Sequence, residues 1–147
     1  MAMTRLHYWL HAQPQYNLHS PFLFDMYREV LFARLTPEER RRHGIPRGDR
    51  YRELLYKCCN HYHLEVAADS QQPPVLLTPT HTFTHSHIHT LNNLSILLLS
   101  RPHATPAAER QWESLKADPT YQVSLDLYDV ALLIRNPHLT PQHLLLR

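Results

Sequence analysis

Glycine is scarce in this chain: only Gly44 and Gly48 occur among its 147 residues. Average usage would give roughly ten glycines in a chain of this length. Because glycine has no Cβ, it allows positive φ angles and the close approach of a ligand to the main chain. The turns that cradle phosphates and nucleotide cofactors depend on these properties. The scarcity of glycine therefore argues against a glycine-rich cofactor loop.

The rest of the composition is typical of a globular protein. Hydrophobic residues make up 43% of the chain and charged residues 19%, a balance that favours one folded domain over a disordered chain. The unbroken apolar runs, such as residues 96–99 and 130–134, are far too short to span a bilayer. The N-terminal sequence lacks the features of a signal peptide, and the adjacent Cys58 and Cys59 indicate no disulfide framework. We therefore expect a cytoplasmic protein. Its net charge of +2 indicates no dominant polyanionic partner.

The N-terminal part of the chain reads as helical. Amphipathic or capped segments predict helices over residues 4–12, 21–31, 37–43 and 49–62. Ser20 and Thr36 each precede a proline, and serine or threonine in that position is a typical N-cap. Gly44 is placed to end the third of these helices. We therefore predict an N-terminal helical region over residues 1–63.

The remaining residues, 64–147, predict an α/β core. Short apolar runs indicate buried strands at 75–78 and 95–99, and Thr105-Pro106 opens a helix that carries Trp112. Alternation from Tyr121 to Leu127 and the apolar run at 130–134 then predict an antiparallel β pair. Two further assignments stay open: residues 64–68 as the end of a helix or a strand, and residues 142–146 as an additional strand. Helices followed by strands and a β pair favour one layered α/β domain.

Several segments together resemble a known family. Residues 16–25 read YNLHSPFLFD, which resembles the "HG-V-HSPFV-D" opening of a bacterial group of class I S-adenosylmethionine-dependent methyltransferases. Residues 54–56 resemble the helix before that family's cofactor strand. Residues 95–99, 112–116 and 123–128 resemble its fifth strand, the following helix with its tryptophan, and its final hairpin. The resemblance implies a reduced Rossmann-like methyltransferase sheet with N-terminal helices and a C-terminal antiparallel β pair.

The chain departs from this family where the cofactor would bind. The acidic position that ends the family's first strand is Leu77 here, and its glycine positions are Pro79 and Phe83. Proline supplies no N–H, and a phenylalanine side chain would obstruct the cofactor's close approach. The family's fifth strand is followed by a cluster of acidic residues and a histidine. In this chain both carboxylates are missing from that stretch, and only the histidine, His103, is present. The resemblance therefore implies that cofactor binding and catalysis have been lost, and we assign no catalytic or cofactor-binding residue.

The shortening has a consequence for the sheet. Residues 80–95 leave room for barely one element, whereas the family places its second, third and fourth strands there. Deleting these strands would leave the strands at 75–78 and 95–99 with unpaired edges, which are costly when buried and prone to association. A new strand within residues 80–90, direct closure of the two strands, or a partner chain could satisfy them. On this ground we predict a homo-oligomer or a protein partner, with a full-length relative as one candidate.

A histidine-rich tract is the candidate metal site. Four histidines lie close together between Thr80 and Thr90: His81, His85, His87 and His89. All four share one face of a strand, and three of them stack along one side of a helix, so either geometry could offer imidazoles to Zn²⁺ or Ni²⁺. The spacing matches no named zinc motif, and no cysteine or nearby carboxylate completes the set. We favour a polar strand or loop over a metal site.

Charged residues elsewhere carry weaker signals. A basic patch comprises Arg40, Arg41, Arg42, Arg47, Arg50 and Arg52. It could bind nucleic acid or an acidic partner, but a solvated helix face balanced by nearby carboxylates is the favoured interpretation. The balancing residues are Glu38, Glu39, Asp49 and Glu53. Asp126 and Asp129 border the terminal hairpin, where we expect them to shape the turn rather than to perform acid–base chemistry.

Three functional hypotheses follow from the sequence. The leading one is a methyltransferase-like protein that has lost cofactor binding and catalysis and acts as a binding or assembly partner. The second is an active S-adenosylmethionine-dependent methyltransferase with an atypical pocket. The third is a small histidine-rich metal-binding protein. We expect no cofactor, although the resemblance points to S-adenosylmethionine and the histidine tract to zinc. We expect neither a membrane nor a nucleic acid as a partner.

Overall fold

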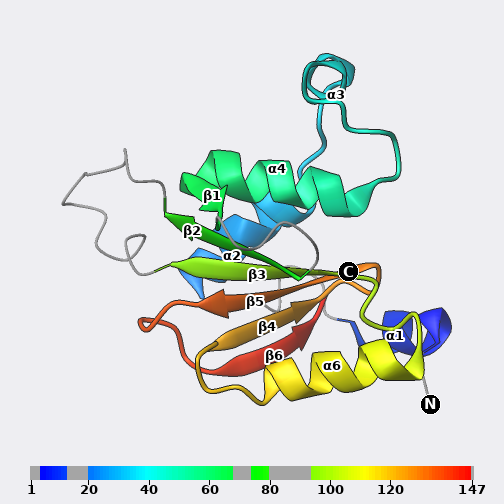
Figure 1. Ribbon diagram of the computed structural model, residues 1–147, viewed down its shortest axis with the longest axis vertical. Helices are drawn as coiled ribbons and strands as arrows, with labels where there is room; N and C mark the ends of the chain where they lie inside the picture. Colours follow the sequence, from blue (N-terminus) through cyan, green and yellow to red (C-terminus); the bar gives the residue numbers. More distant parts are fainter. Residues whose placement is uncertain (1–3, 13–19, 68–73, 80–93, 147) are drawn as a thin grey trace.

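A six-stranded mixed β-sheet forms the centre of the structure, a computed structural model that describes residues 4–12, 20–67, 74–79 and 94–146 (Figure 1). The strands are β1 (Leu64–Val66), β2 (Val75–Pro79), β3 (Ser95–Ser100), β4 (Val123–Asp126), β5 (Val130–Arg135) and β6 (Gln142–Leu145). Their order across the sheet is β1-β2-β3-β5-β4-β6. The predicted α/β class is confirmed, and the two open assignments, residues 64–68 and 142–146, both contain a short strand.

Four of the helices begin at side-chain caps, at positions where the sequence predicts helices to start. They are α1 (Arg5–His11), α2 (Pro21–Met26), the π-helical turn η2 (Tyr27–Leu31), α3 (Pro37–His43), α4 (Arg50–Tyr62) and α6 (Pro106–Lys116). The side chains of Ser20, Thr36, Asp49 and Thr105 each accept a backbone N–H at the start of a helix. Gly44 adopts a left-handed conformation at the end of α3, as its sequence position predicts.

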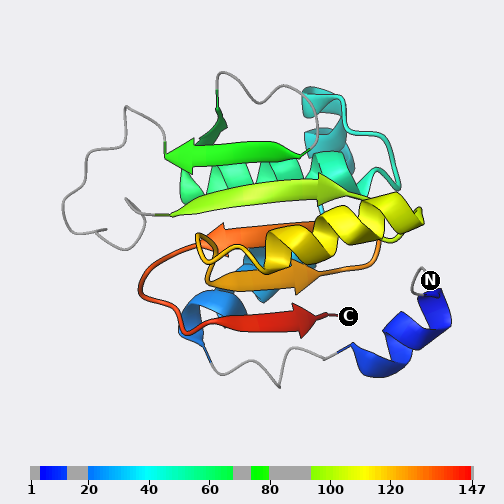
Figure 2. The ribbon, with the colours of Figure 1, turned by 60° about the horizontal axis from the view of Figure 1, so that its bottom comes forward.

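Strand direction differs from that of a Rossmann-like sheet around β2. Such a sheet holds its nucleotide-binding strands parallel, whereas β2 pairs antiparallel with both β1 and β3. The C-terminal half has a different pattern. β5 lies between β3 and β4 and runs antiparallel to both, so β3 and β4 are parallel to each other and are joined through α6. β6 then adds in parallel beside β4 (Figure 2).

The strands predicted to have unpaired edges are paired on both sides. β2 lies between β1 and β3, and β3 lies between β2 and β5. The two strands have closed up directly, which was one of the three solutions considered. Unpaired edges of these two strands therefore give no reason to expect self-association.

The sheet is covered on both faces, which is why its central strands are almost wholly apolar. On one face, α2 and α4 contribute Leu23 and Leu54 to a large cluster that also contains Leu77 and Ile96 from the strands. Side chains from residues 1–63 and from residues 64–147 thus share one core. On the opposite face, α6 packs Trp112 against a smaller apolar cluster (Figures 1 and 2). That cluster consists of Leu97, Leu99, Trp112, Ala131 and Leu133. Among the helices in the described parts of the chain, none combines the length and hydropathy that a membrane crossing requires.

Both glycines adopt positive φ angles, at 63° for Gly44 and 81° for Gly48. Three residues other than glycine also have positive φ angles: His63 at 55°, Arg101 at 51° and Tyr128 at 72°. An L-residue in this region costs roughly 1–2 kcal/mol relative to right-handed backbone. The chain therefore tolerates strain at corners where glycine would be the ordinary choice. Two of these corners lie just beyond parallel strands: Arg101 directly follows β3, and Tyr128 lies two residues after the end of β4.

We expect Trp112→Ala to lower the free energy of unfolding by about 3–5 kcal/mol, since it empties the centre of the cluster under α6. Trp112→Phe should cost less, because it keeps an aromatic ring in place. It also removes the indole N–H, which is buried and has no hydrogen-bond partner among the described residues. Urea unfolding followed by circular dichroism would measure both values. Equal losses for the two variants would contradict this account of the packing.

Candidate functional site

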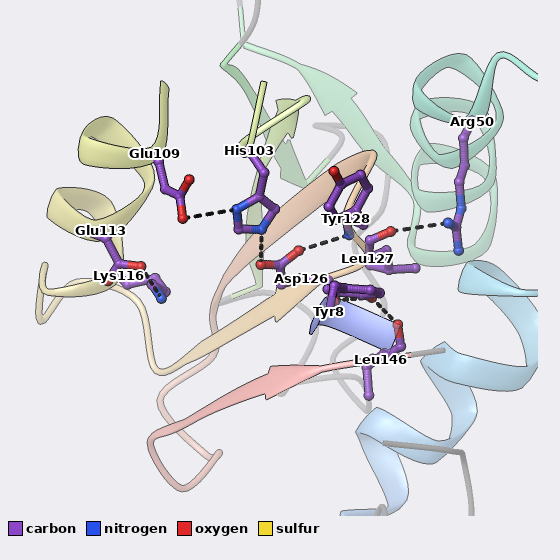
Figure 3. A network of polar contacts seen from close by, with 10 residues as sticks. All are labelled: Tyr8, Arg50, His103, Glu109, Glu113, Lys116, Asp126, Leu127, Tyr128 and Leu146. Carbon is purple, nitrogen blue, oxygen red and sulfur yellow. Dashed lines mark hydrogen bonds and ion pairs between the residues drawn. The ribbon is translucent and has the colours of Figure 1, made fainter. Parts of the chain in front are cut away.

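A buried polar cluster lies at the carboxyl ends of the parallel strands β3 and β4 (Figure 3). His103 follows β3, Asp126 is the last residue of β4, and Glu109 lies in the first turn of α6. Tyr128 and Tyr8 complete the cluster from the β4–β5 turn and from α1. The polar side chains lie here because Asp126 alternates with the core-facing Leu125 along β4. It thus points to the sheet face where α6 begins.

The imidazole of His103 lies between two carboxylates. Its Nε2 is 2.5 Å from Oδ2 of Asp126, and its Nδ1 is 3.5 Å from Oε1 of Glu109. The first contact is a short hydrogen bond, and the second has the length of an ion pair rather than of a good hydrogen bond. The His103 and Asp126 side chains are only 3% and 4% exposed. Both ring nitrogens therefore face negative charge in a region shielded from water.

This environment favours the protonated imidazole. Burial of the ring is the largest influence and disfavours the charged form, but the hydrogen bond and charge of Asp126, assisted by Glu109, outweigh it. The net result is that the pKa of His103 is raised above its ordinary value. In the protonated state Nε2 donates to Asp126, while Nδ1 has no hydrogen-bond partner among the described residues and faces the charge of Glu109.

Asp126 is the hub of the cluster. Its Oδ1 accepts the backbone N–H of Tyr128 at 2.8 Å, which holds the strained turn between β4 and β5. Its backbone carbonyl lies 2.7 Å from the hydroxyl of Tyr8, whose single proton is shared between this carbonyl and that of Leu146. Burial and the nearby charge of Asp126 raise the pKa of the Tyr8 phenol, so this hydroxyl stays protonated as a donor. The side chain of Tyr8 thus ties α1 to the end of β4 and to Leu146, which follows β6.

Aromatic rings and a guanidinium close the outer side of the cluster. The ring of Tyr128 stacks on His103 with centroids 5.5 Å apart, and the ring of Tyr8 lies 5.4 Å from that of Tyr128. The guanidinium of Arg5 lies 5.2 Å above the Tyr128 ring and forms an ion pair of 3.1 Å with Asp129. The cavity that remains at His103 has a volume of only about 130 Å³, well below the roughly 300–1,000 Å³ of small-molecule sites.

The geometry does not suit His103 for general acid–base catalysis. A catalytic histidine keeps one ring nitrogen oriented by a carboxylate and the other free to exchange a proton with substrate. Here Asp126 occupies the first position, but Glu109 occupies the second. Because the two carboxylates lie on opposite sides of the ring, they cannot converge on one metal ion with it. Within the described residues, no three His, Cys, Asp or Glu side chains are grouped as a metal site requires.

The described residues also do not fit S-adenosylmethionine. In open α/β sheets, ligands bind beyond the carboxyl ends of neighbouring parallel strands. β2 and β3 are antiparallel, so their carboxyl ends lie at opposite edges of the sheet. Leu77, at the family's acidic position, is fully buried in β2, and Pro79 is paired with Leu64. Beyond the end of β3, the polar cluster leaves a cavity of only about 130 Å³.

The structure tests some of the site residues predicted from the sequence and does not describe others. The candidate metal ligands His81, His85, His87 and His89 lie outside the described residues, as does Phe83. The expectation that Asp126 shapes its turn is confirmed by its bond to the Tyr128 N–H. Its short bond to His103 was missed, as was the role of Tyr8. Two signals in the sequence pointed to this pair: a polar residue ends a strand that otherwise reads as buried, and a histidine follows the preceding buried strand.

Comparisons of the chain with models of protein families, with curated protein sequences and with solved structures found no match.

We expect the cluster to make stability depend on pH. The folded-state pKa of His103 is raised, so its contribution is fully present below the unfolded-state pKa of about 6.5 and is lost as the pH rises through the folded-state value. The free energy of unfolding should therefore fall over this window. Urea unfolding at a series of pH values would measure the slope, and NMR titration of the imidazole in the unaltered protein would give the pKa directly.

His103→Gln should flatten that slope and lower stability at pH 6 by about 3–5 kcal/mol, since it leaves buried carboxylates without their counter-charge. His138→Gln is the matched control, because His138 is exposed and, within the described part of the chain, its backbone N–H is the group that forms a hydrogen bond. A titration that places the pKa of His103 below that of free histidine would refute the charged-cluster assignment.

Proposed function

We propose that this chain is a shortened, methyltransferase-like protein that has lost cofactor binding and catalysis and acts as a binding or assembly partner. The arrangement of its C-terminal half supports the relationship. A strand (β3), a helix carrying a buried tryptophan (α6) and an antiparallel hairpin (β4 and β5) follow one another as in the closing segments that the resemblance implies. The capped helix that begins at Pro21 fits the family's opening motif.

The observation that carries the loss of catalysis is the filled space beyond β3 and β4. A methyltransferase needs an open cleft at that edge for its cofactor and substrate. Here His103 is enclosed by Asp126 and Glu109, and the cavity beside it holds about 130 Å³. The residues act on one another: they fix the turns after both strands and hold α6 against the sheet. A rigid network of this kind suits a scaffold better than a site that must admit two ligands.

Support for a binding role comes from the surface. Leu6 and Leu10 are 69% and 62% exposed on α1 and lie one helical turn apart. Both therefore present apolar area on the same side of the helix, as residues that meet a partner chain commonly do. The helix itself is held to the sheet through the hydroxyl of Tyr8. A protein partner, including a second copy of this chain, could thus be bound on a fixed element.

Calorimetric titration with S-adenosylmethionine tests the loss of the cofactor site. We expect no saturable heat at millimolar cofactor, and no rise in the free energy of unfolding in its presence. A ligand present at 100 times its Kd would raise that free energy by about 2.7 kcal/mol, which urea unfolding detects easily. Titration with S-adenosylhomocysteine controls for a site that prefers the product. Saturable binding of either compound would favour the active-enzyme alternative.

Light scattering over a range of protein concentrations tests the assembly role. We expect the mean mass to rise with concentration, and the double variant Leu6→Gln/Leu10→Gln to remain monomeric, because it removes the exposed apolar pair. Val66→Gln is the control, since Val66 is a partly exposed apolar residue on β1, elsewhere on the surface. A monomer at high concentration, or equal effects of the two changes, would contradict self-association through α1.

A further inference from the structure

A basic hollow of about 840 Å³ lies beside α3, far larger than the cavity at His103. Four arginines line it: Arg34, Arg40, Arg41 and Arg47. They come from the segment before α3, from the helix itself and from the segment after it. Because the chain reverses at the end of α3, side chains that are distant in sequence surround the same space. The helix stands out from the sheet and from α4 (Figure 1).

The walls of the hollow are held by specific contacts. Gly44 turns the chain in a left-handed conformation, after which the N–H of Ile45 bonds the carbonyl of Arg40 at 3.0 Å. Ile45 is buried and so anchors the returning segment. On the other side, the ammonium of Lys57 donates to the carbonyl of Ala33 at 2.7 Å, next to Arg34. The hollow therefore has a supported frame on both sides.

The charges around this hollow are only partly balanced. Arg40 pairs with Glu53, which joins α3 to α4. Two arginines outside the hollow also have acidic partners: Arg42 pairs with Glu38, and Arg52 pairs with Asp49. The balanced helix face favoured from the sequence is thus confirmed for these residues.

The other three arginines in the hollow differ from Arg40 in their charge balance. Arg34, Arg41 and Arg47 have no acidic partner among the described residues, and all three are exposed. Like charges that line one space repel each other, and an anion bound between them would relieve that repulsion. The planar guanidinium fork also matches the oxygens of phosphate in paired hydrogen bonds.

Apolar side chains make up much of the remaining wall. Leu35, Pro37, Ile45 and Pro46 line the hollow together with the arginines. Rigid apolar walls with a few charged groups are typical of small-molecule sites, which measure roughly 300–1,000 Å³. The volume here lies within that range. The combination suits a ligand with a ring or apolar body and more than one negative charge.

We propose that this hollow binds a small phosphorylated ring compound of the nucleoside polyphosphate class. Three guanidinium groups without an acidic partner in the described part of the chain match a di- or triphosphate better than the single charge of a carboxylate. The apolar wall accommodates the base. This inference goes beyond the proposed function and does not depend on the relationship to methyltransferases. S-adenosylmethionine carries no phosphate. The result of the S-adenosylmethionine titration, which tests the proposed function, is therefore independent of the result of the experiment below, which tests the hollow.

Isothermal calorimetry with ADP tests the proposal, and adenosine and pyrophosphate divide the ligand into its two parts. We expect saturable binding of ADP that weakens as salt is added, weaker binding of pyrophosphate, and none of adenosine. Arg41→Gln and Arg47→Gln should each weaken ADP binding roughly tenfold or more, since each removes a charged hydrogen-bond donor. Arg42→Gln is the matched control on the same helix and should leave binding unchanged. Circular dichroism should find all three variants folded.

Absence of ADP binding at millimolar concentration would overturn the proposal. So would equal losses in Arg41→Gln and Arg42→Gln, since diffuse attraction by the whole basic patch would explain them. A short single-stranded oligonucleotide serves as a final probe. If it binds through Arg41 and Arg47 while ADP does not, the surface recognises a nucleic-acid backbone and the small-ligand assignment is wrong.

Discussion

The insertion of β5 between β3 and β4 is the constraint on which the rest of the structure depends. Five of its six residues are buried, so its backbone groups must find partners within the sheet. It finds them on both sides, in antiparallel ladders that run its whole length against β3 and most of its length against β4. This arrangement makes β3 and β4 parallel and brings their carboxyl ends to one edge. The polar cluster, the position of α6 and the placement of α1 all follow from it.

Local signals in the sequence predicted the elements well, because short-range chemistry determines them. Ser20, Thr36 and Thr105 cap helices that open on proline, and Trp112 marks the buried face of α6. Strand pairing was less accessible. The apolar run at β2 specifies a buried strand but carries no information on its direction, since a strand covered on both faces lacks a distinctive alternation. The antiparallel contact between β2 and β3 therefore emerged only from the three-dimensional structure.

The polar cluster illustrates why sites are harder to predict than elements. His103 and Asp126 are separated by a helix and a strand, and neither belongs to a recognisable spacing motif. Their contact depends on the parallel alignment of β3 with β4, which a third strand creates. The resemblance to methyltransferases implies an acidic cluster near the position of His103, which this sequence lacks. The structure gives this histidine two carboxylates from other positions, Glu109 and Asp126, and so a role in holding the fold together.

Gly44 lines the basic hollow, and Gly48 directly follows Arg47 of that hollow in the sequence. Both glycines have positive φ angles and open space where a Cβ would stand. The rest of the chain contains none, and it carries 12 prolines. This distribution also acts on the unfolded state, because each glycine replaced by a residue with a side chain, and each proline gained, removes backbone conformations that folding would otherwise have to sacrifice. Such changes contribute about 0.4–1 kcal/mol each where the native backbone accepts them. The unfolded ensemble of this protein is therefore narrower than that of an average chain of equal length, and part of its stability comes from conformations that the unfolded chain cannot adopt.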